Sequence, residues 1–277
     1  MDIKQFNTGE TVEDLKEIYN PEGSIKRRIQ LRLLDMLVYL DKVCKEIKVD
    51  YRLDSGLVLG AVRHGGFIPW DDDMDVAIDS YADYKRLCNY LKAHPHSQYV
   101  LQDDTTDNGH FKYWSTLRDL KSEYIHMEEG EDILDKMLKF RGLQIDICPF
   151  DRGVFQSLYL NYAKLNRKEK WALLEHKYIK LKVIHSVRKC ICNPILRLVS
   201  CLWGNRQLYM YSYGIPFKYR HIPKDVLLPH RPILFEGIEF PGPAKPEKYC
   251  EIFYGNYMDL PPVDERDHHM VTYKIWD

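Results

Sequence analysis

Apolar residues in the first fifty positions of the chain recur in steps of three and four. From residue 25 onward they stand at Ile29, Leu33, Met36, Leu40, Val43 and Ile47. This is the spacing of one face of an α-helix, so the pattern predicts a long amphipathic helix over residues 25–47. Residues 49–53 then alternate as in a half-buried strand, and the apolar run 57–62 favours a short helix. Together these elements predict a strand, glycine turn and helix unit.

The middle of the chain mixes strand and helix patterns. Residues 73–78 alternate acidic and apolar side chains, which predicts a strand with its carboxylates on one face. Asp79 or Ser80 can then cap a helix that runs to His94. Further strands are predicted over residues 99–101, 113–117, 124–127 and 142–147, the last of them ended by Pro149. This mixture indicates an α+β domain with a mixed central sheet flanked by helices.

The second half of the chain carries a basic helical segment and a hairpin. Residues 161–206 have a helical pattern rich in Lys and Arg, mixed with apolar residues. Residues 233–235 and 238–240 flank Glu236-Gly237 as a predicted hairpin. A helix is then predicted over residues 246–254, with proline at its start and Gly255 at its end.

Composition narrows the classes of function. The 40 basic and 41 acidic residues give a net charge of -1, which argues against nucleic acid as the partner. The seven cysteines form no CxxC pair, so we expect a reducing, cytoplasmic setting. No apolar run reaches the roughly 18 residues of a membrane span, and the polar start of the chain is unlike a signal peptide.

The chemistry concentrates in a short acidic block. Asp71, Asp72, Asp73 and Asp75 place four carboxylates in five positions, and such crowding requires cations or hydrogen-bond donors to compensate it. On a strand, Asp73 and Asp75 would point to the same face. Two such carboxylates suit Mg²⁺ or Mn²⁺, which also bind substrate phosphates. A solvated turn or a calcium loop is the alternative interpretation.

A phosphate site is expected beside these acids. A helix that opens at Gly56 would direct free N–H groups and its positive end toward an anion, and Arg63 on the same helix could add a phosphate contact. A third carboxylate is expected from a neighbouring strand. Asp146, between two isoleucines in a strand pattern, is the candidate. A phosphate cradle beside a metal-binding strand is the layout of nucleotidyltransferase-like enzymes.

Three blocks of sequence resemble the LicD family, which is related to fukutin-like proteins. They are residues 56–75 with the Gly-Phe-Ile-Pro-Trp-Asp-Asp-Asp run, residues 144–151, and residues 235–262. The resemblance implies metal and diphosphate binding by Asp73 and Asp75, with Asp71 as an additional metal ligand and Asp146 as the third metal-binding and catalytic acid. Leu57 replaces the family's usual hydroxyl residue, so a hydroxyl contact to phosphate would fall to Ser55. The expected donor-binding set is Ser55, Gly56, Arg63, His64, Trp70 and Asp72.

The resemblance also predicts how the chain is divided. We expect an N-terminal helical region over residues 1–48 and a nucleotidyltransferase-like catalytic core over residues 49–155. A basic helical insertion follows over residues 156–210. Residues 211–277 would then complete the domain with a hairpin and a helix.

The resemblance implies a transferase. It would move phosphocholine or a similar group from a CDP-linked donor to a hydroxyl of a cell-surface glycan or its lipid-linked precursor, and release CMP. Nucleotidyl transfer to a small molecule or protein is one alternative, and a non-catalytic calcium- and membrane-binding module is another. Because the basic segment mixes cations with apolar residues, it suits peripheral contact with anionic lipid, so we expect the enzyme at the inner face of the cytoplasmic membrane. A solvated helical face or a groove for the acceptor is the alternative interpretation of this segment.

Overall fold

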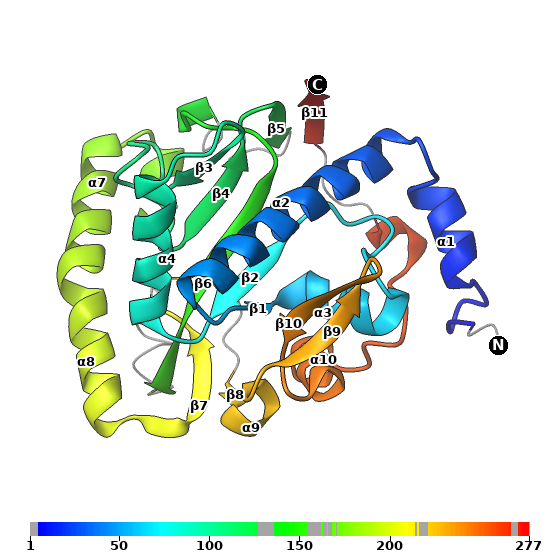
Figure 1. Cartoon of the computed structure of the whole chain (residues 1–277). Coiled ribbons are helices and arrows are strands. Elements are labelled where there is room, and N and C mark those ends of the chain that lie inside the picture. The colour runs from blue at the N-terminus through cyan, green and yellow to red at the C-terminus, as the bar shows by residue number, and fades with distance from the viewer. Residues whose placement is uncertain are drawn as a thin grey trace.

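A mixed sheet forms the centre of the computed structural model (Figure 1). The structure describes residues 5–126, 136–154, 171–213, 221–266 and 271–276, together with residues 162, 165, 168, 169 and 215. Within them, the main sheet has the strand order β1 (Arg52–Leu53), β2 (Asp75–Ile78), β6 (Gln144–Val154), β4 (Ser115–Asp119) and β3 (Tyr99–Gln102). β6 also pairs with β7 (Asn205–Tyr211), which pairs with β8 (Ile222–Pro223).

Two helices lie on the same face of this sheet. α2 (Ile25–Ile47) and α4 (Tyr81–Ala93) lie in front of the strands in Figure 1. α2 confirms the predicted helix and buries the predicted positions from Ile29 to Val43. Ser80 caps α4, because its hydroxyl accepts a hydrogen bond from the N–H of Asp83. The apolar faces of both helices join one core with the inward residues of β2, β4 and β6.

Contacts of β4 show which face of the sheet is left for chemistry. The hydroxyls of Tyr84 on α4 and Ser115 on β4 lie 2.7 Å apart, so Ser115 faces the helices. Successive strand residues point to opposite faces, so Thr116 faces the other side. Its register partner on β6 is Asp146. The candidate acid therefore lies on the face of the sheet opposite α4.

Several predicted strands have different bounds in the structure. β3, β4 and β5 (Ser122–His126) lie close to the predicted ranges, although Met127 is outside the described residues. β1 is shorter than predicted, and β2 begins at Asp75, so Asp73 precedes the strand. The prediction that Pro149 ends its strand is wrong, since β6 continues to Val154. Pro149 stands where pairing with β2 ends and pairing with β7 begins, which is how a strand tolerates a residue without an N–H.

The predicted basic helical segment is confirmed where it is described. Part of residues 155–170 lies outside the described residues, but α7 (Tyr178–Val187), the π-helical turn η1 (Arg188–Cys192) and α8 (Asn193–Trp203) follow one another directly. α8 contacts β6.

The predicted C-terminal hairpin and helix are confirmed. β9 (Arg231–Phe235) and β10 (Ile238–Gly242) pair around Glu236 and Gly237, which both have positive φ, at 51° and 77°. α10 (Pro246–Tyr254) begins with proline as predicted. Further elements are α1 (Val12–Tyr19), α3 (Ser55–His64), α9 (Lys224–Leu227), the 3-10 turn η2 (Val263–Glu265), and β11 (Val271–Ile275), which pairs with β5.

Candidate active site

Two carboxylates meet on adjacent parallel strands at the centre of the sheet. Asp75 opens β2, and its register partner is Asp146 on β6. Asp146 is held from both sides: Thr116 Oγ1 donates to its Oδ1 at 2.7 Å, and Lys112 Nζ lies 3.4 Å from its Oδ2. The side chain of Asp146 is 12% exposed, so the acid is almost enclosed yet reachable.

The two acids differ in their electrostatics. Desolvation and the charges of Asp146, Asp54 and Asp73 hold the pKa of Asp75 well above its usual range. For Asp146, burial works to raise the pKa, but Lys112 and the hydrogen bond from Thr116 outweigh it and the pKa is lowered. Asp146 is therefore ionised at neutral pH, and its carboxylate accepts hydrogen bonds. The excess of negative charge around Asp75 calls for a cation.

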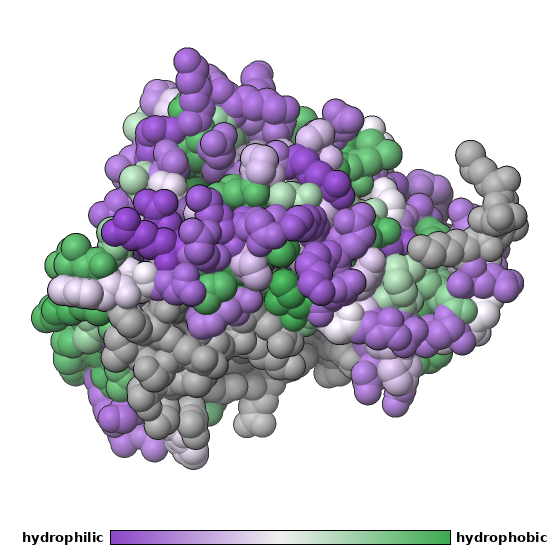
Figure 2. Space-filling model, turned by 90° about the horizontal axis from the view of Figure 1, so that it is seen from below, coloured by the Kyte–Doolittle hydropathy of each residue, from purple (hydrophilic) through white to green (hydrophobic). Residues whose placement is uncertain are grey.

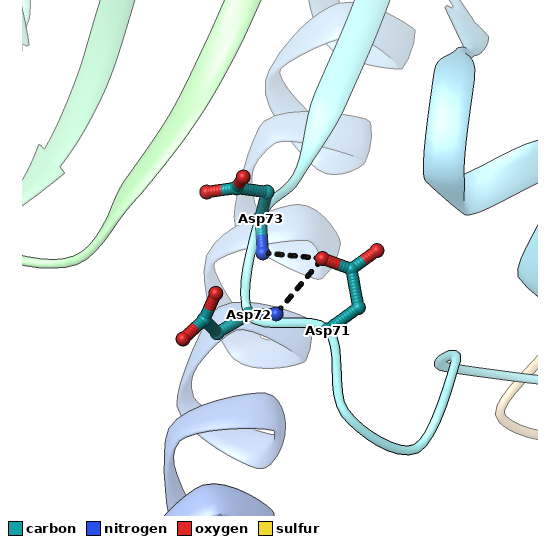
Figure 3. A group of neighbouring side chains, drawn as sticks. All are labelled: Asp71, Asp72 and Asp73. Carbon is teal, nitrogen blue, oxygen red and sulfur yellow. Dashed lines mark hydrogen bonds between the residues drawn. The ribbon is translucent and has the colours of Figure 1, made fainter. Parts of the chain in front are cut away.

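The acidic block before β2 forms a tight turn (Figure 3). Asp71 Oδ1 accepts hydrogen bonds from the N–H groups of Asp72, at 3.0 Å, and Asp73, at 3.3 Å. Such turns, closed by the side chain of an aspartate, fix the chain that follows them. Oxygens of Asp71, Asp72 and Asp73 lie within 4.8 Å of one another, and these three residues could hold a metal ion.

Asp72 is drawn toward the protein interior. It is 2% exposed, its Oδ2 accepts a hydrogen bond from the hydroxyl of Tyr273 on β11, and Lys26 Nζ on α2 lies 3.9 Å away. These contacts tie the acidic turn to both ends of the chain. They give Asp72 a positioning role in this structure, whereas the sequence placed it in the donor-binding set.

The start of α3 (Ser55–His64) faces the acidic turn. A Cβ at Gly56 would lie 2.8 Å from Asp71 Oδ2, so glycine lets the carboxylate of Asp71 approach the start of the helix in this position. The N–H of Ser55 donates to the hydroxyl of Tyr249 at 3.1 Å, and its own hydroxyl lies 2.9 Å from that of Tyr211. The structure therefore brings Gly56 to the acids, and it engages Ser55 with tyrosines.

Asp54, immediately before α3, is a buried acid that the sequence interpretation missed. It is fully buried, and it accepts hydrogen bonds from Arg52, from the hydroxyl of Tyr211 at 2.6 Å, and from the hydroxyl of Tyr249. Its N–H donates to the carbonyl of Asp75 at 3.1 Å, which joins the start of α3 to the start of β2. The local signal was an aspartate at a helix cap position. Its partners are too distant in sequence for any local pattern to indicate them.

Tyr254 at the end of α10 is 41% exposed, and its hydroxyl lies close enough to the acids for their charges to act on it. Desolvation of the hydroxyl and the charges of Asp54, Asp71 and Asp75 raise its pKa. The hydroxyl therefore stays protonated and can donate a hydrogen bond into the site.

Three predicted donor-binding residues lie away from the start of α3. Arg63 is in the last turn of this helix, where its Nη1 donates to the carbonyls of Tyr257, at 2.9 Å, and Asp259, at 3.2 Å. Its Nε donates to His64 Nε2 at 2.9 Å. Burial and the charge of Arg63 lower the pKa of His64 to about 3, so this imidazole is neutral. The ring of Trp70 lies between those of Tyr19 and His64.

Arg63→Ala is expected to reduce stability and leave donor binding unchanged. The variant loses the hydrogen bonds of a buried guanidinium to two carbonyls, which costs about 1.5–3 kcal/mol. Chemical denaturation and donor titration measure the two effects, with the exposed Arg28→Ala as control. An unchanged stability together with a tenfold loss of donor affinity would instead support the phosphate contact that the sequence predicts.

Comparisons with known proteins identify relatives of this chain. Residues 48–183 match the family model described as LicD/FKTN/FKRP, nucleotidyltransferase domain. Over 269 residues the chain is 25% identical to the lipopolysaccharide cholinephosphotransferase LicD of Haemophilus influenzae. This match covers 88% of this chain and 96% of that protein. Shorter matches, at 37% and 40% identity, occur with uncharacterised proteins of Rickettsia typhi and Rickettsia prowazekii, each covering 18% of the relative.

The family match contains the whole acidic constellation. Asp54, Gly56, the turn at residues 71–73, Asp75 and Asp146 all lie inside residues 48–183. The longer relative extends the similarity over most of the remaining chain. The chain therefore belongs to the LicD/FKTN/FKRP family, whose nucleotidyltransferase domain it carries.

Proposed function

We propose that this protein transfers phosphocholine, or a similar phospho-substituted group, from a CDP-linked donor to a hydroxyl of a cell-surface glycan or its lipid-linked precursor. The observation that carries the proposal is the pairing of Asp75 with Asp146 on adjacent parallel strands, next to the acidic turn and the start of α3. The related Haemophilus protein is named as a cholinephosphotransferase of lipopolysaccharide, which supports the choice of donor and acceptor.

The acids fit a divalent cation with hard oxygen ligands. Asp73, Asp75 and Asp146 are the proposed ligands, with Asp71 as an additional one, and Mg²⁺ or Mn²⁺ is the proposed ion. The raised pKa of Asp75 supports this choice, because a carboxylate surrounded by Asp146, Asp54 and Asp73 is costly without a compensating cation. When bound, the ion would neutralise the diphosphate and stabilise charge on the attacking and leaving oxygens.

The donor would bind where the start of α3 meets the acidic turn. The positive end of α3, where Gly56 lies against Asp71, favours a phosphate at this position. The Tyr254 hydroxyl, on which the charges of these acids act, would supply a further donor. These residues would orient the diphosphate with its bridging oxygen toward the acids.

The acceptor hydroxyl would approach Asp146. In the proposed reaction this oxygen forms a bond to the phosphorus that bears the choline, and the bond from that phosphorus to the bridging oxygen breaks, so CMP leaves. The hydroxyl proton passes toward the ionised Asp146 carboxylate, which Thr116 and Lys112 hold in place. Lys112 also offsets the negative charge that the acceptor meets there.

CDP-choline together with Mg²⁺ or Mn²⁺ is expected to raise the melting temperature of the protein. A ligand at one hundred times its dissociation constant stabilises the native state by about 2.7 kcal/mol. A thermal-shift panel of CDP-choline, CDP-ethanolamine, CDP-glycerol and CDP-ribitol, with and without EDTA, identifies the donor. Stabilisation that persists in EDTA would contradict a metal-dependent donor site.

The released nucleotide distinguishes the alternative reaction. The matched domain is described as a nucleotidyltransferase, so CTP and ATP form a second arm of the experiment. Release of CMP from the CDP-linked donor supports the proposal, whereas release of pyrophosphate from CTP or ATP supports nucleotidyl transfer. Stabilisation by Ca²⁺ alone, without binding of any nucleotide, would support a non-catalytic calcium- and membrane-binding module.

A further inference from the structure

A line of large apolar side chains lies exposed along the helical segment from α7 to α8. Exposed fractions of these side chains range from 44% to 83%. Single exposed apolar residues are ordinary on protein surfaces, but a continuous line of them marks an interaction surface. We call this line the apolar ridge, and its members are Ile179, Val183, Val187, Ile191, Ile195, Leu198, Leu202 and Trp203.

The π-helical turn keeps the apolar ridge straight. Residues four apart in an α-helix advance by about 40° beyond a full turn, so a ridge with this spacing would wind around the helix. The wider turn at Arg188–Cys192 offsets that advance in the middle of the segment. The whole segment, residues 178–203, is about 39 Å long. In Figure 2 the hydrophobic surface gathers at the left edge, where α7 and α8 lie in Figure 1.

The exposed charge beside the first turns of the apolar ridge is positive. Residues 177–206 contain seven Lys or Arg and not one Asp or Glu. Four of the seven pair with acids from outside this range, namely Lys177 with Glu175, Arg188 with Glu169, Lys189 with Asp104 and Arg197 with Asp151. Lys180 and Lys182 are exposed, and helical geometry places them about 80° to either side of the line from Ile179 to Val183. Lysines in such flanking positions can reach past an apolar contact with their long stems and keep their charge in water.

We propose that the apolar ridge docks on the surface of a bilayer that contains anionic lipid. Its side chains would enter the boundary between headgroups and acyl chains, while Lys180 and Lys182 bind anionic headgroups on either side. None of the helices in the described part of the chain combines the length and apolar character that a bilayer crossing requires. The helix therefore lies in the plane of the interface.

A second copy of the chain is a poorer occupant of this surface. Two copies joined through the apolar ridge would bring the exposed Lys180 and Lys182 of both copies together, and like charges facing each other across an interface oppose association. An anionic bilayer removes that repulsion. The positive charge of these two lysines thus favours the bilayer over a second copy.

The docking helix is joined rigidly to the strand that carries Asp146. Arg197 on α8 donates from Nε to Asp151 Oδ2 at 3.0 Å, and Arg188 pairs with Glu169 beneath the apolar ridge. Asp151 and Asp146 are five residues apart on β6, which is about 17 Å along a strand. Docking would therefore hold the proposed catalytic acid at a fixed height above the membrane. This advantage rests on the proposed function, because it requires a lipid-linked acceptor.

Co-sedimentation of the full chain with vesicles tests the proposal without any measurement of activity. Binding to vesicles of phosphatidylcholine with about 30% phosphatidylglycerol is compared with binding to vesicles of phosphatidylcholine alone, at low and at high salt. We choose this anionic fraction to give a surface potential of about −30 to −50 mV. We expect binding to the anionic vesicles that weakens with salt. Lys180→Gln with Lys182→Gln should reduce it about 30-fold. Ile179→Ser with Ile191→Ser and Leu198→Ser should reduce it at least tenfold.

The matched control removes exposed apolar side chains elsewhere on the molecule. Ile18, Leu234 and Val263 are 61%, 57% and 67% exposed on other elements, so their change to serine should leave vesicle binding unaltered. Equal losses in the control and ridge variants would overturn the proposal. So would failure of the wild type to bind anionic vesicles at low salt. Light scattering that shows a dimer dissociated by the ridge variant, without vesicle binding, would assign the ridge to self-association.

Discussion

Asp75→Asn and Asp146→Asn are each expected to lower the rate of phosphocholine transfer by about a thousandfold or more. The two aspartates are register partners on the adjacent strands β2 and β6, and each is proposed to bind the metal. Loss of one ligand removes several kcal/mol of charge stabilisation in the transition state, and about 1.4 kcal/mol corresponds to each factor of ten. Release of CMP from the donor that the thermal-shift panel identifies measures the rate.

The same two substitutions should have opposite effects on the stability of the metal-free protein at neutral pH. A carboxylate with a raised folded-state pKa costs stability above its unfolded pKa, so Asp75→Asn should maintain or raise the melting temperature. A carboxylate with a lowered pKa adds stability there, so Asp146→Asn should lower it. The effect of Asp75→Asn should fade as the pH falls toward about 3.9, the ordinary pKa of aspartate, whereas the effect of Asp146→Asn should persist to that pH and fade only below it, as the pH passes the lowered pKa of the folded state.

Asp264→Asn is the control for this pair, since Asp264 is exposed on η2 and away from the acids. It should change neither the rate nor the melting temperature. Melting curves of all three variants in EDTA separate folding from metal binding. Retention of full activity by Asp75→Asn would exclude this residue as a metal ligand.

Arg52→Met is expected to destabilise the protein by about 3–5 kcal/mol, which is the cost of leaving a buried charge without its partner. Arg52 is fully buried, pairs with Asp54, and its Nε lies 3.4 Å from Asp79 Oδ1. Its guanidinium lies 4.4 Å from the ring centre of Phe150. Asp79 keeps a second partner in His230, at 2.8 Å, so the loss of Arg52 affects Asp54 more than Asp79. Urea denaturation measures the change.

Neutralising Asp54 should rescue much of this loss. In the double variant Arg52→Met with Asp54→Asn the buried carboxylate is gone, and most of the lost stability should return. Arg86→Met is the control, because Arg86 is an exposed arginine paired with Asp83, and it should cost less than about 1 kcal/mol. Equal stability of Arg52→Met and the wild type would show that Asp54 does not depend on this arginine.

Periodic segments could be predicted well from the sequence. The helix at residues 25–47 repeats its apolar positions over six turns, and nothing else in the fold competes with that signal. α1 was missed although its signal is local: Thr11 and Asp14 form a capping box at its start. The pattern at residues 73–78 gave the strand, but it could not show that the acidic turn holds Asp73 outside it.

The candidate site was predictable only in part, for a physical reason. The aspartates of the acidic block, residues 71–75, stand close together in sequence, so they form a visible pattern. The residues that hold them in place do not: Lys112 and Thr116 reach Asp146 across 34 and 30 positions, and Tyr249 reaches Asp54 across 195. Arg63 shows the converse. Its place on the helix after Gly56 suggested phosphate binding, but carbonyls of residues 257 and 259 hold it.

The hydrogen bonds to Asp54 also determine how far this protein can be truncated. Tyr211 and Tyr249 lie beyond residue 183, where the match to the family domain ends. Of the three residues that donate to the Asp54 carboxylate, a fragment trimmed to the matched residues would retain Arg52 and lose Tyr211 and Tyr249. Two hydrogen bonds to this buried carboxylate would then be unmade. The stretch that matches the family domain is therefore smaller than the stretch that supports Asp54. A chimera or an expression clone has to retain β7 and α10 for Asp54 to keep these hydrogen bonds.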